Sequence, residues 1–258
     1  MVVQHNLTAM NANRQLSGVT SAQAKSTEKL SSGYRINRAA DDAAGLSISE
    51  KLRSQIRGLD KAASNSQDGI SLVQVAEGAL NETHSILQRM NELATQAAND
   101  TNTSTDRASI QKEMDQLTSE IDRIRSTTQF NSMNLLDGTF TGMKLQVGAL
   151  SGQSIVISID NMNASSLKIS GLKVSSFSSA GKAMTAIQKA INSVSVQRSK
   201  LGAIQNRLEH TINNLNTTSE NTSAAESRIR DVDMATEMVE YSKNNILAQA
   251  GQSMLAQA

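Results

Sequence analysis

Few residues in this sequence have the types and spacing that catalysis or metal binding requires. The three histidines, His5, His84 and His210, lie far apart, and none stands in a metal-binding pattern such as H-E-x-x-H. Asp41 and Asp42 are adjacent carboxylates that could ligate a metal ion, but no histidine or further acid follows them closely. Capping of the helix that begins after them is the better interpretation. The chain has no cysteine, which excludes disulfide and thiolate chemistry.

Known catalytic and ligand-binding motifs are also missing from the sequence. It contains no G-x-S-x-G, no phosphate loop and no dinucleotide fingerprint. The net charge is +1, from 25 basic and 24 acidic residues, which gives no bulk attraction to nucleic acid. No apolar run approaches the ~20 residues of a membrane span, and the first residues do not resemble a cleaved secretory signal. We therefore expect no enzyme, no cofactor or metal, and neither a nucleic-acid nor a membrane partner.

The elements that would have to position any site are long helices. The stretch 46–99 contains no proline, and mostly apolar side chains recur in it at alternating steps of four and three from Leu52 to Ala97, with polar residues at Ser66, Glu77 and His84. This 3.5-residue spacing predicts a helix with one coiled-coil seam. At 1.5 Å per residue the helix would be about 80 Å long. It must therefore lie beside other long helices.

Two further stretches supply those partner helices. The first repeats the four-three spacing after a short connection, with Thr103 or Ser104 as its expected N-cap, and it must fold back antiparallel. Its apolar positions are Ile110, Met114, Leu117, Ile121 and Ile124. The second, from about 183 onward, has apolar residues every seven positions, at Ile187, Val194, Leu201, Leu208 and Leu215.

The stretch 131–180 has a different pattern. It is rich in turn residues, and Leu145 and Val147 alternate with polar neighbours. Ile155, Ile157 and Ile159 follow with the same period of two, across a turn-like segment at 148–153. This spacing predicts a β-hairpin. The insert is too small for a separate large domain, so we expect it on the end or flank of the bundle.

The two ends of the chain have weaker helical stripes, in residues 5–32 and 226–258. Neither end can bury its stripe alone, and stripes at both ends invite burial against other copies in a head-to-tail contact, which gives a helical filament. The fold class we predict is mainly α, a long antiparallel coiled-coil helix bundle with a small β-hairpin region and paired terminal helices. The residues expected to carry polymerisation are Leu7, Met10, Leu16, Val19, Leu30, Val232, Val239, Ile246, Leu247 and Leu255.

Two regions of the chain, one towards each end, resemble a known family. Residues 30–46, Leu-Ser-Ser-Gly-Tyr-Arg-Ile-Asn followed by Arg-Ala-Ala-Asp-Asp-Ala-Ala-Gly-Leu, resemble the N-terminal signature of bacterial flagellins. Residues 227–233, Ser-Arg-Ile-Arg-Asp-Val-Asp, and 246–250, Ile-Leu-Ala-Gln-Ala, resemble the C-terminal signature. The positions that carry the match are Gly33, Arg35, Ile36, Asn37, Asp41, Asp42, Arg228, Ile229 and Asp231. The short middle resembles a flagellin without large outer domains.

The resemblance implies a structural subunit of the extracellular bacterial flagellar filament, which serves motility. Flagellins are exported by the flagellar type III apparatus with an export chaperone, and they polymerise under a filament cap. By this resemblance, residues 1–33 and 230–258 form the inner tube of the filament. Residues 34–229 form a helical rod that carries the insert at 131–180. Flagellins usually continue past Ala258 with a short tail that contains proline and several leucines.

A second site is implied by the resemblance alone. In many flagellins the vertebrate flagellin-sensing Toll-like receptor binds a patch on the outer helices of the rod. The matching residues are Arg89, Leu93 and Glu113. Arg89 and Glu113 lie off the seams, so we expect them to be exposed. The alternative from physical chemistry alone is a pair of solvated helix charges.

Two other functions fit parts of this pattern. A hook–filament junction protein shares the terminal arrangement but usually matches the double-aspartate stretch less well. A cytosolic helical adaptor or signalling rod would keep the long seams and leave the matching end helices unexplained. A filament subunit sediments as long polymers, whereas an adaptor stays in solution.

Overall fold

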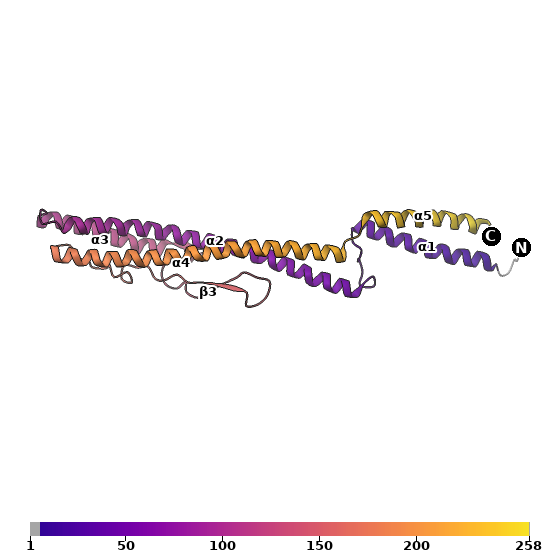
Figure 1. Cartoon of the computed structure of the whole chain (residues 1–258), viewed down its shortest axis with the longest axis horizontal. Helices are drawn as coiled ribbons and strands as arrows, with labels where there is room; N and C mark the ends of the chain where they lie inside the picture. Colours follow the sequence, from indigo (N-terminus) through magenta and orange to yellow (C-terminus); the bar gives the residue numbers. More distant parts are fainter. Residues whose placement is uncertain (1–5, 258) are drawn as a thin grey trace. The chain divides into compact units, whose positions relative to one another are not determined.

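The computed structural model describes residues 6–257 and shows a mainly α protein (Figure 1). Its helices are α1 (Leu7–Ser32), α2 (Ala43–Ala97), α3 (Ser104–Thr127), α4 (Phe177–Arg230) and α5 (Met234–Gln257). Its short strands are β1 (Gln129–Phe130), β2 (Met133–Asn134), β3 (Met143–Gln146) and β4 (Ser154–Ile157). Within the described residues, no helix is long and apolar enough to cross a membrane.

The chain divides into two compact units. Residues 58–217 form what we call the bundle unit, and residues up to Arg57 together with those from Thr218 onward form the terminal unit. The boundaries predicted from the sequence lie elsewhere, near the end of α1 and near the end of α4. Because compact units and filament layers are different things, those boundaries stay a prediction.

In the bundle unit, α2 lies beside α3 and α4 (Figure 1). The Arg107 guanidinium of α3 donates to the Ala97 carbonyl at the end of α2, at 3.0 Å, so the short connection reverses the chain as predicted. Nearer the start of α2 than Ala97, Glu77 forms an ion pair with Arg198 of α4 at 2.9 Å. Helix α4 is also antiparallel to α2 in this unit.

The predicted seams form the core of the bundle unit. Seam residues of all three helices are buried, among them Leu80, Leu87, Met90, Met114, Ile121, Ile187, Val194 and Leu201. The expectation of one seam on the long helix was too narrow, because Leu72, Ala76 and Leu93 are buried as well. Helix α2 lies beside both α3 and α4 (Figure 1), so more than one of its faces is packed. Burying a wider apolar face than a coiled-coil seam follows from that position.

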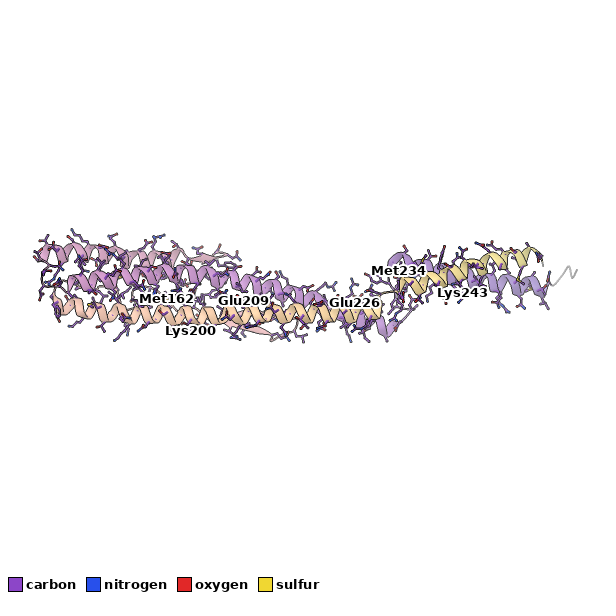
Figure 2. All side chains as sticks on the ribbon, turned by 45° about the horizontal axis from the view of Figure 1, so that its top comes forward. Met162, Lys200, Glu209, Glu226, Met234 and Lys243 are labelled. Carbon is purple, nitrogen blue, oxygen red and sulfur yellow. The ribbon has the colours of Figure 1, made fainter. Side chains whose placement is uncertain are left out.

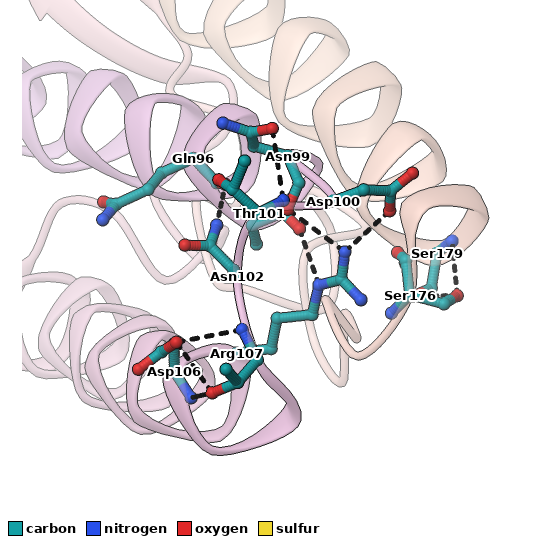
Figure 3. A network of polar contacts seen from close by, with 11 residues as sticks. Gln96, Asn99, Asp100, Thr101, Asn102, Asp106, Arg107, Ser176 and Ser179 are labelled. Carbon is teal, nitrogen blue, oxygen red and sulfur yellow. Dashed lines mark hydrogen bonds and ion pairs between the residues drawn. The ribbon is translucent and has the colours of Figure 1, made fainter.

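The connection between α2 and α3 is fixed by polar contacts (Figure 3). Thr103 is the N-cap of α3: its hydroxyl accepts from the Asp106 N–H at 3.3 Å, and the Asp106 carboxylate accepts from the Thr103 N–H at 2.9 Å. This reciprocal capping box satisfies two N–H groups that the first helical turn leaves unpaired. Of the two residues predicted as possible caps, the structure confirms Thr103.

The insert contains the predicted hairpin and a smaller one. Strands β3 and β4 are antiparallel, with Leu145 opposite Ile155. Strands β1 and β2 form a hairpin with a two-residue turn that no sequence pattern predicted, and its turn residues Asn131 and Ser132 are both in the left-handed region, at φ 48° and 62°. Such a turn requires positive φ at both positions. Asparagine tolerates it, but serine gives a weak signal.

The β3–β4 hairpin lies on the flank of the bundle unit because two glycines of α2 admit it. A Cβ at Gly69 would collide with the Leu145 side chain, and one at Gly58 would lie 2.9 Å from the Ala149 Cβ. These two positions let the hairpin approach the helix backbone closely. The expected flank position is thus confirmed.

The terminal unit pairs α1 with α5, side by side and antiparallel (Figure 1). Lys29 near the end of α1 contacts Glu237 near the start of α5 at 3.2 Å, and Leu16 lies against Gly251. Gly33 ends α1 with φ 75°, a left-handed conformation that glycine adopts without steric cost.

The single helix expected over 226–258 is interrupted. Helix α4 continues through Arg230, and α5 begins at Met234; Figure 2 labels Glu226 and Met234 on the two sides of this break. The Asp233 carboxylate accepts from the backbone N–H groups of Ala235 and Thr236, at 3.0 and 3.2 Å. An acidic side chain that caps these N–H groups starts a new helix here.

Candidate assembly and recognition sites

The two family-like stretches meet in the terminal unit. The Arg35 N–H donates to the Arg230 carbonyl at 2.7 Å, and the Val232 N–H donates to the Gly33 carbonyl at 3.0 Å. These bonds flank an antiparallel bridge between Tyr34 and Asp231. We call residues 33–37 and 229–232 the clasp. It joins the segment that follows α1 to the segment that precedes α5.

Side chains reinforce the clasp from both sides. The Arg35 guanidinium donates to the Ile229 carbonyl at 2.6 Å. Arg230 lies over the Tyr34 ring, 4.6 Å from its centroid, and pairs with Glu50 of α2 at 2.9 Å. A cation above an aromatic face is attracted by the ring quadrupole. Both arginines therefore hold the two segments together.

One contact outside the clasp joins α2 to α4. The Ser49 hydroxyl, fully buried, donates to a Glu226 carboxylate oxygen at 3.0 Å. Burial makes this hydrogen bond costly to lose, because either group would then be left without a partner. No sequence pattern predicted the contacts of Ser49, Glu226, Glu50, Tyr34 and Arg230. Their contacts join residues far apart in the chain, and only the matched motifs placed Tyr34 and Arg230 near the site.

The two adjacent aspartates have different roles. Asp42 accepts the Gly45 N–H at 2.8 Å and caps α2, which confirms the capping prediction for that residue. The same prediction is wrong for Asp41. Its carboxylate accepts N–H groups of Asn37 and Arg38 in the loop, at 3.3 and 3.1 Å.

Asp41 also forms an ion pair with Lys25 of α1, at 2.8 Å. The hydrogen bond from Lys25, with those from the Arg38 and Asn37 N–H groups, lowers the pKa of Asp41 to about 2. The same pair raises the pKa of Lys25. Over residues 6–257, no group of three or more histidines and acids is placed to hold a metal ion.

The remaining family-motif positions divide between core and surface. Ile36 is buried, and Asn37 donates to the Tyr34 carbonyl at 3.3 Å, which closes the loop after α1. Ile229 and Asp231 lie in the clasp through their backbone atoms. Arg228 is exposed.

The terminal helices bury few residues against each other. Those buried in the pair are Ser26, Asn244 and Ala248, two of them polar and one small. Of the predicted polymerisation residues, five are exposed: Leu7, Met10, Val239, Ile246 and Leu247. Val239 and Ile246 are 69% and 68% exposed. The other five, Leu16, Val19, Leu30, Val232 and Leu255, are half-buried.

The predicted recognition residues lie where α2 and α3 meet. The Arg89 guanidinium donates to Glu113 of α3 at 2.9 and 3.1 Å and to Glu92 at 3.2 Å. The side chains of Arg89 and Glu113 are 51% and 46% exposed, as expected for positions off the seams. Hydrogen bonds from Arg89 to both carboxylates raise its pKa. Leu93 is only 2% exposed and belongs to the core, so any role in recognition would be to support the surface residues.

Comparison with known proteins identifies the family. The bacterial flagellin N-terminal helical region matches residues 3–141, and the bacterial flagellin C-terminal helical region matches residues 184–258. The chain belongs to the bacterial flagellin family. Flagellins form the extracellular filament of the bacterial flagellum, so this is a family of structural proteins.

Whole-chain relatives agree with this assignment. The flagellin of Halalkalibacterium halodurans is 56% identical and that of Bacillus subtilis 51% identical, each alignment covering 100% of this chain and 96% of the relative. A flagellar filament core protein of Treponema maltophilum is 49% identical with the same coverage. The relatives are therefore matched over nearly their full length.

Solved structures support the fold. The crystal structure of Bacillus cereus flagellin is 34% identical with a TM-score of 0.54, covering 63% of this chain and 94% of that one. A putative hook-associated protein of Vibrio parahaemolyticus has a TM-score of 0.62, covering 74% of this chain and all of that one. At 14% identity the second likeness concerns the fold alone.

Proposed function

We propose that this chain polymerises into the extracellular flagellar filament through the outward faces of α1 and α5, and that the filament serves motility. The observation that carries this proposal is the inverted burial of the terminal helices, by which we mean that polar residues are buried in the pair and large apolar residues are exposed. The pair buries Ser26 and Asn244 while Val239 and Ile246 remain exposed. Apolar surface of this kind marks an interaction site.

The same burial pattern supports other copies of this chain as the partner that covers the exposed residues. A two-helix pair with polar residues inside is weakly stabilised by its own packing. Further copies of the same helices would bury the apolar side chains outside. A heterologous contact repeated without closure gives a helical filament.

Removal of both terminal helices tests the proposal. A chain lacking residues 1–32 and 234–258 keeps the buried core of the bundle unit and should remain helical and in solution. The full chain should sediment as long polymers under assembly conditions, as judged by pelleting and negative-stain microscopy. Filaments formed by the trimmed chain would overturn the proposal.

The layering of the filament and its assembly partners follow from the same proposal. We assign residues 1–33 and 230–258 to the inner tube and residues 34–229, with the insert at 131–180, to the surrounding helical rod. An export chaperone and a filament cap would act on the terminal helices before their apolar faces meet other copies. The whole-chain matches to flagellins favour a filament subunit over a junction protein or an adaptor.

We further propose that the vertebrate flagellin-sensing Toll-like receptor recognises the patch around Arg89 and Glu113. Support comes from the exposure of both side chains and from their shared position on α2 and α3. The ion pair holds the guanidinium in one orientation, so a partner would bind a surface that is already ordered. Leu93 lies beneath and keeps the two helices packed.

A further inference from the structure

A groove of about 510 Å³ lies in the bundle unit, between α4 and the turn at 163–168. The turn contributes residues 166–168, and α4 contributes residues between 182 and 193. Three cations and three hydroxyl groups line the groove: Lys168, Lys182, Lys189, Ser166, Thr185 and Ser193. Among the described residues that line it, none is acidic. The groove thus concentrates positive charge on a chain whose net charge is only +1.

Among the residues that the structure describes, none pairs a carboxylate with any of the three lysines. All three are exposed, and none forms an ion pair with a residue that the structure describes. The nearby Lys200 differs, because it pairs with Asp160 at 3.3 Å. Like charges around one groove repel each other, and a bound anion would relieve that repulsion.

The backbone at Lys168 is a second, independent observation. Lys168 has φ 58°, in the left-handed region. Its N–H donates to the Ser165 carbonyl at 3.1 Å, and the Ile169 N–H donates to the Ala164 carbonyl at 2.9 Å. This is the Schellman pattern, which usually has glycine at the left-handed position. A lysine there bears a steric cost that glycine avoids, and such an outlier motivates a functional hypothesis.

We propose that this groove binds an acidic polysaccharide. Lys182 and Lys189 are two helical turns apart, about 10 Å along the axis. That spacing suits anionic groups that repeat along an extended chain better than one isolated phosphate. The Thr185 and Ser193 hydroxyls donate to the Gly181 and Lys189 carbonyls, at 3.1 and 3.0 Å, and their oxygens can accept from sugar hydroxyls. The Ser166 hydroxyl can donate as well as accept. Single-stranded nucleic acid is the weaker fit, since no described aromatic residue lines the groove for base stacking.

The test uses the full chain and dextran sulfate as the acidic probe, with uncharged dextran as the matched neutral polymer. A groove variant, K168Q/K182Q/K189Q, is compared with a control variant, K51Q/K61Q/K112Q, which loses the same charge elsewhere. We expect wild type and control to bind dextran sulfate alike in titration calorimetry and not to bind dextran. The groove variant should bind about ten-fold more weakly and with a shallower salt dependence. Equal binding by the groove and control variants would overturn the proposal.

Three further measurements distinguish the sources of binding. The K168G variant keeps a residue suited to the left-handed turn, so it should retain the wild-type circular dichroism spectrum yet bind dextran sulfate several-fold more weakly. Wild-type affinity in K168G would contradict a role of the Lys168 side chain in binding. Inorganic sulfate should bind far more weakly than dextran sulfate, and equal affinity would overturn a polymer site. Equal affinity for single-stranded DNA through the same lysines would replace the polysaccharide with a nucleic acid.

Discussion

The Arg35 guanidinium donates a 2.6 Å hydrogen bond to the backbone carbonyl of Ile229, which lies 194 positions later in the chain. With the backbone bonds from Arg35 to Arg230 and from Val232 to Gly33, it fixes where α1 ends relative to where α5 begins. The register of the terminal pair is therefore set at one end by the clasp. The long helices that lie between these residues in the sequence do not set this register.

Arg35→Ala should loosen the clasp without unfolding the bundle unit. The loss of one charge-assisted hydrogen bond to a carbonyl should cost about 1–2 kcal/mol of local stability. We expect faster hydrogen exchange in α1 and α5 and unchanged exchange in α3. The control is Arg38→Ala, which removes an exposed ion pair with Glu28 and should have a smaller effect. Uniformly faster exchange throughout the chain would contradict the local role.

Ile246→Asp should block polymerisation and leave the monomer folded. Ile246 is exposed in the isolated chain, so an aspartate there costs little, whereas burial of its charge between copies would be strongly unfavourable. Pelleting should fall to background while the circular dichroism spectrum stays that of wild type. Val156→Asp, at an exposed position of β4, is the control and should still form filaments. Normal filaments from Ile246→Asp would exclude this residue from the interface.

Arg89→Asp should abolish activation of the flagellin-sensing receptor and leave filaments intact. The variant places a third carboxylate beside Glu92 and Glu113, which removes the cation a partner would contact. Receptor-reporter cells and pelleting of the same preparations measure the two effects. Arg123→Asp, which breaks the exposed pair with Glu120 on α3, is the matched control.

The charge-swapped variant R89E/E113R separates recognition from stability. It can re-form an ion pair between α2 and α3, so the two helices should remain packed. If recognition requires the native surface, the swap stays inactive. Restored activation would show that the ion pair acts only by holding the helices together.

The loop between α1 and α2 should respond to acid through Asp41. Its pKa is lowered from 3.8 to about 2 in the folded chain, so its contribution to stability is complete above about pH 4 and is lost as the pH falls toward 2. Lys25→Met should raise the pKa of Asp41, which NMR titration of its carboxyl carbon measures. The variant should also shift acid-induced opening of this loop to higher pH. An unchanged Asp41 titration would show that Lys25 does not hold the carboxylate.

Leu80→Ala should destabilise the bundle unit by about 2–5 kcal/mol, because it removes a fully buried side chain and leaves a cavity. Urea denaturation followed by circular dichroism measures the change. Val75→Ala, at an exposed position of the same helix, should change stability by less than about 1 kcal/mol. A similar loss in both variants would contradict the burial of the seam.

Local patterns in the sequence predicted much of the architecture. The heptad positions Ile187, Val194 and Leu201 are buried as their spacing indicated, and Thr103 caps α3. The alternation around Ile155 gave the β3–β4 hairpin. These features depend on residues that are close in the chain, so they can be predicted from the sequence alone.

Other features depended on packing between distant segments. The sequence could not show that Leu93 is core, because its burial requires a neighbour on a second side of α2. Nor could it separate Asp42, which caps α2, from Asp41, which pairs with Lys25 on another helix.

By itself the sequence determined that the chain forms long helices with defined seams, and its motifs indicated the flagellin family. Only the tertiary structure decided that Arg35 meets Ile229, that Arg230 covers Tyr34, and that Val239 and Ile246 remain outside the terminal pair. The physical reason is that helical periodicity records which side chains share a face. Which partner covers that face depends on the chain reversals and close approaches between distant segments.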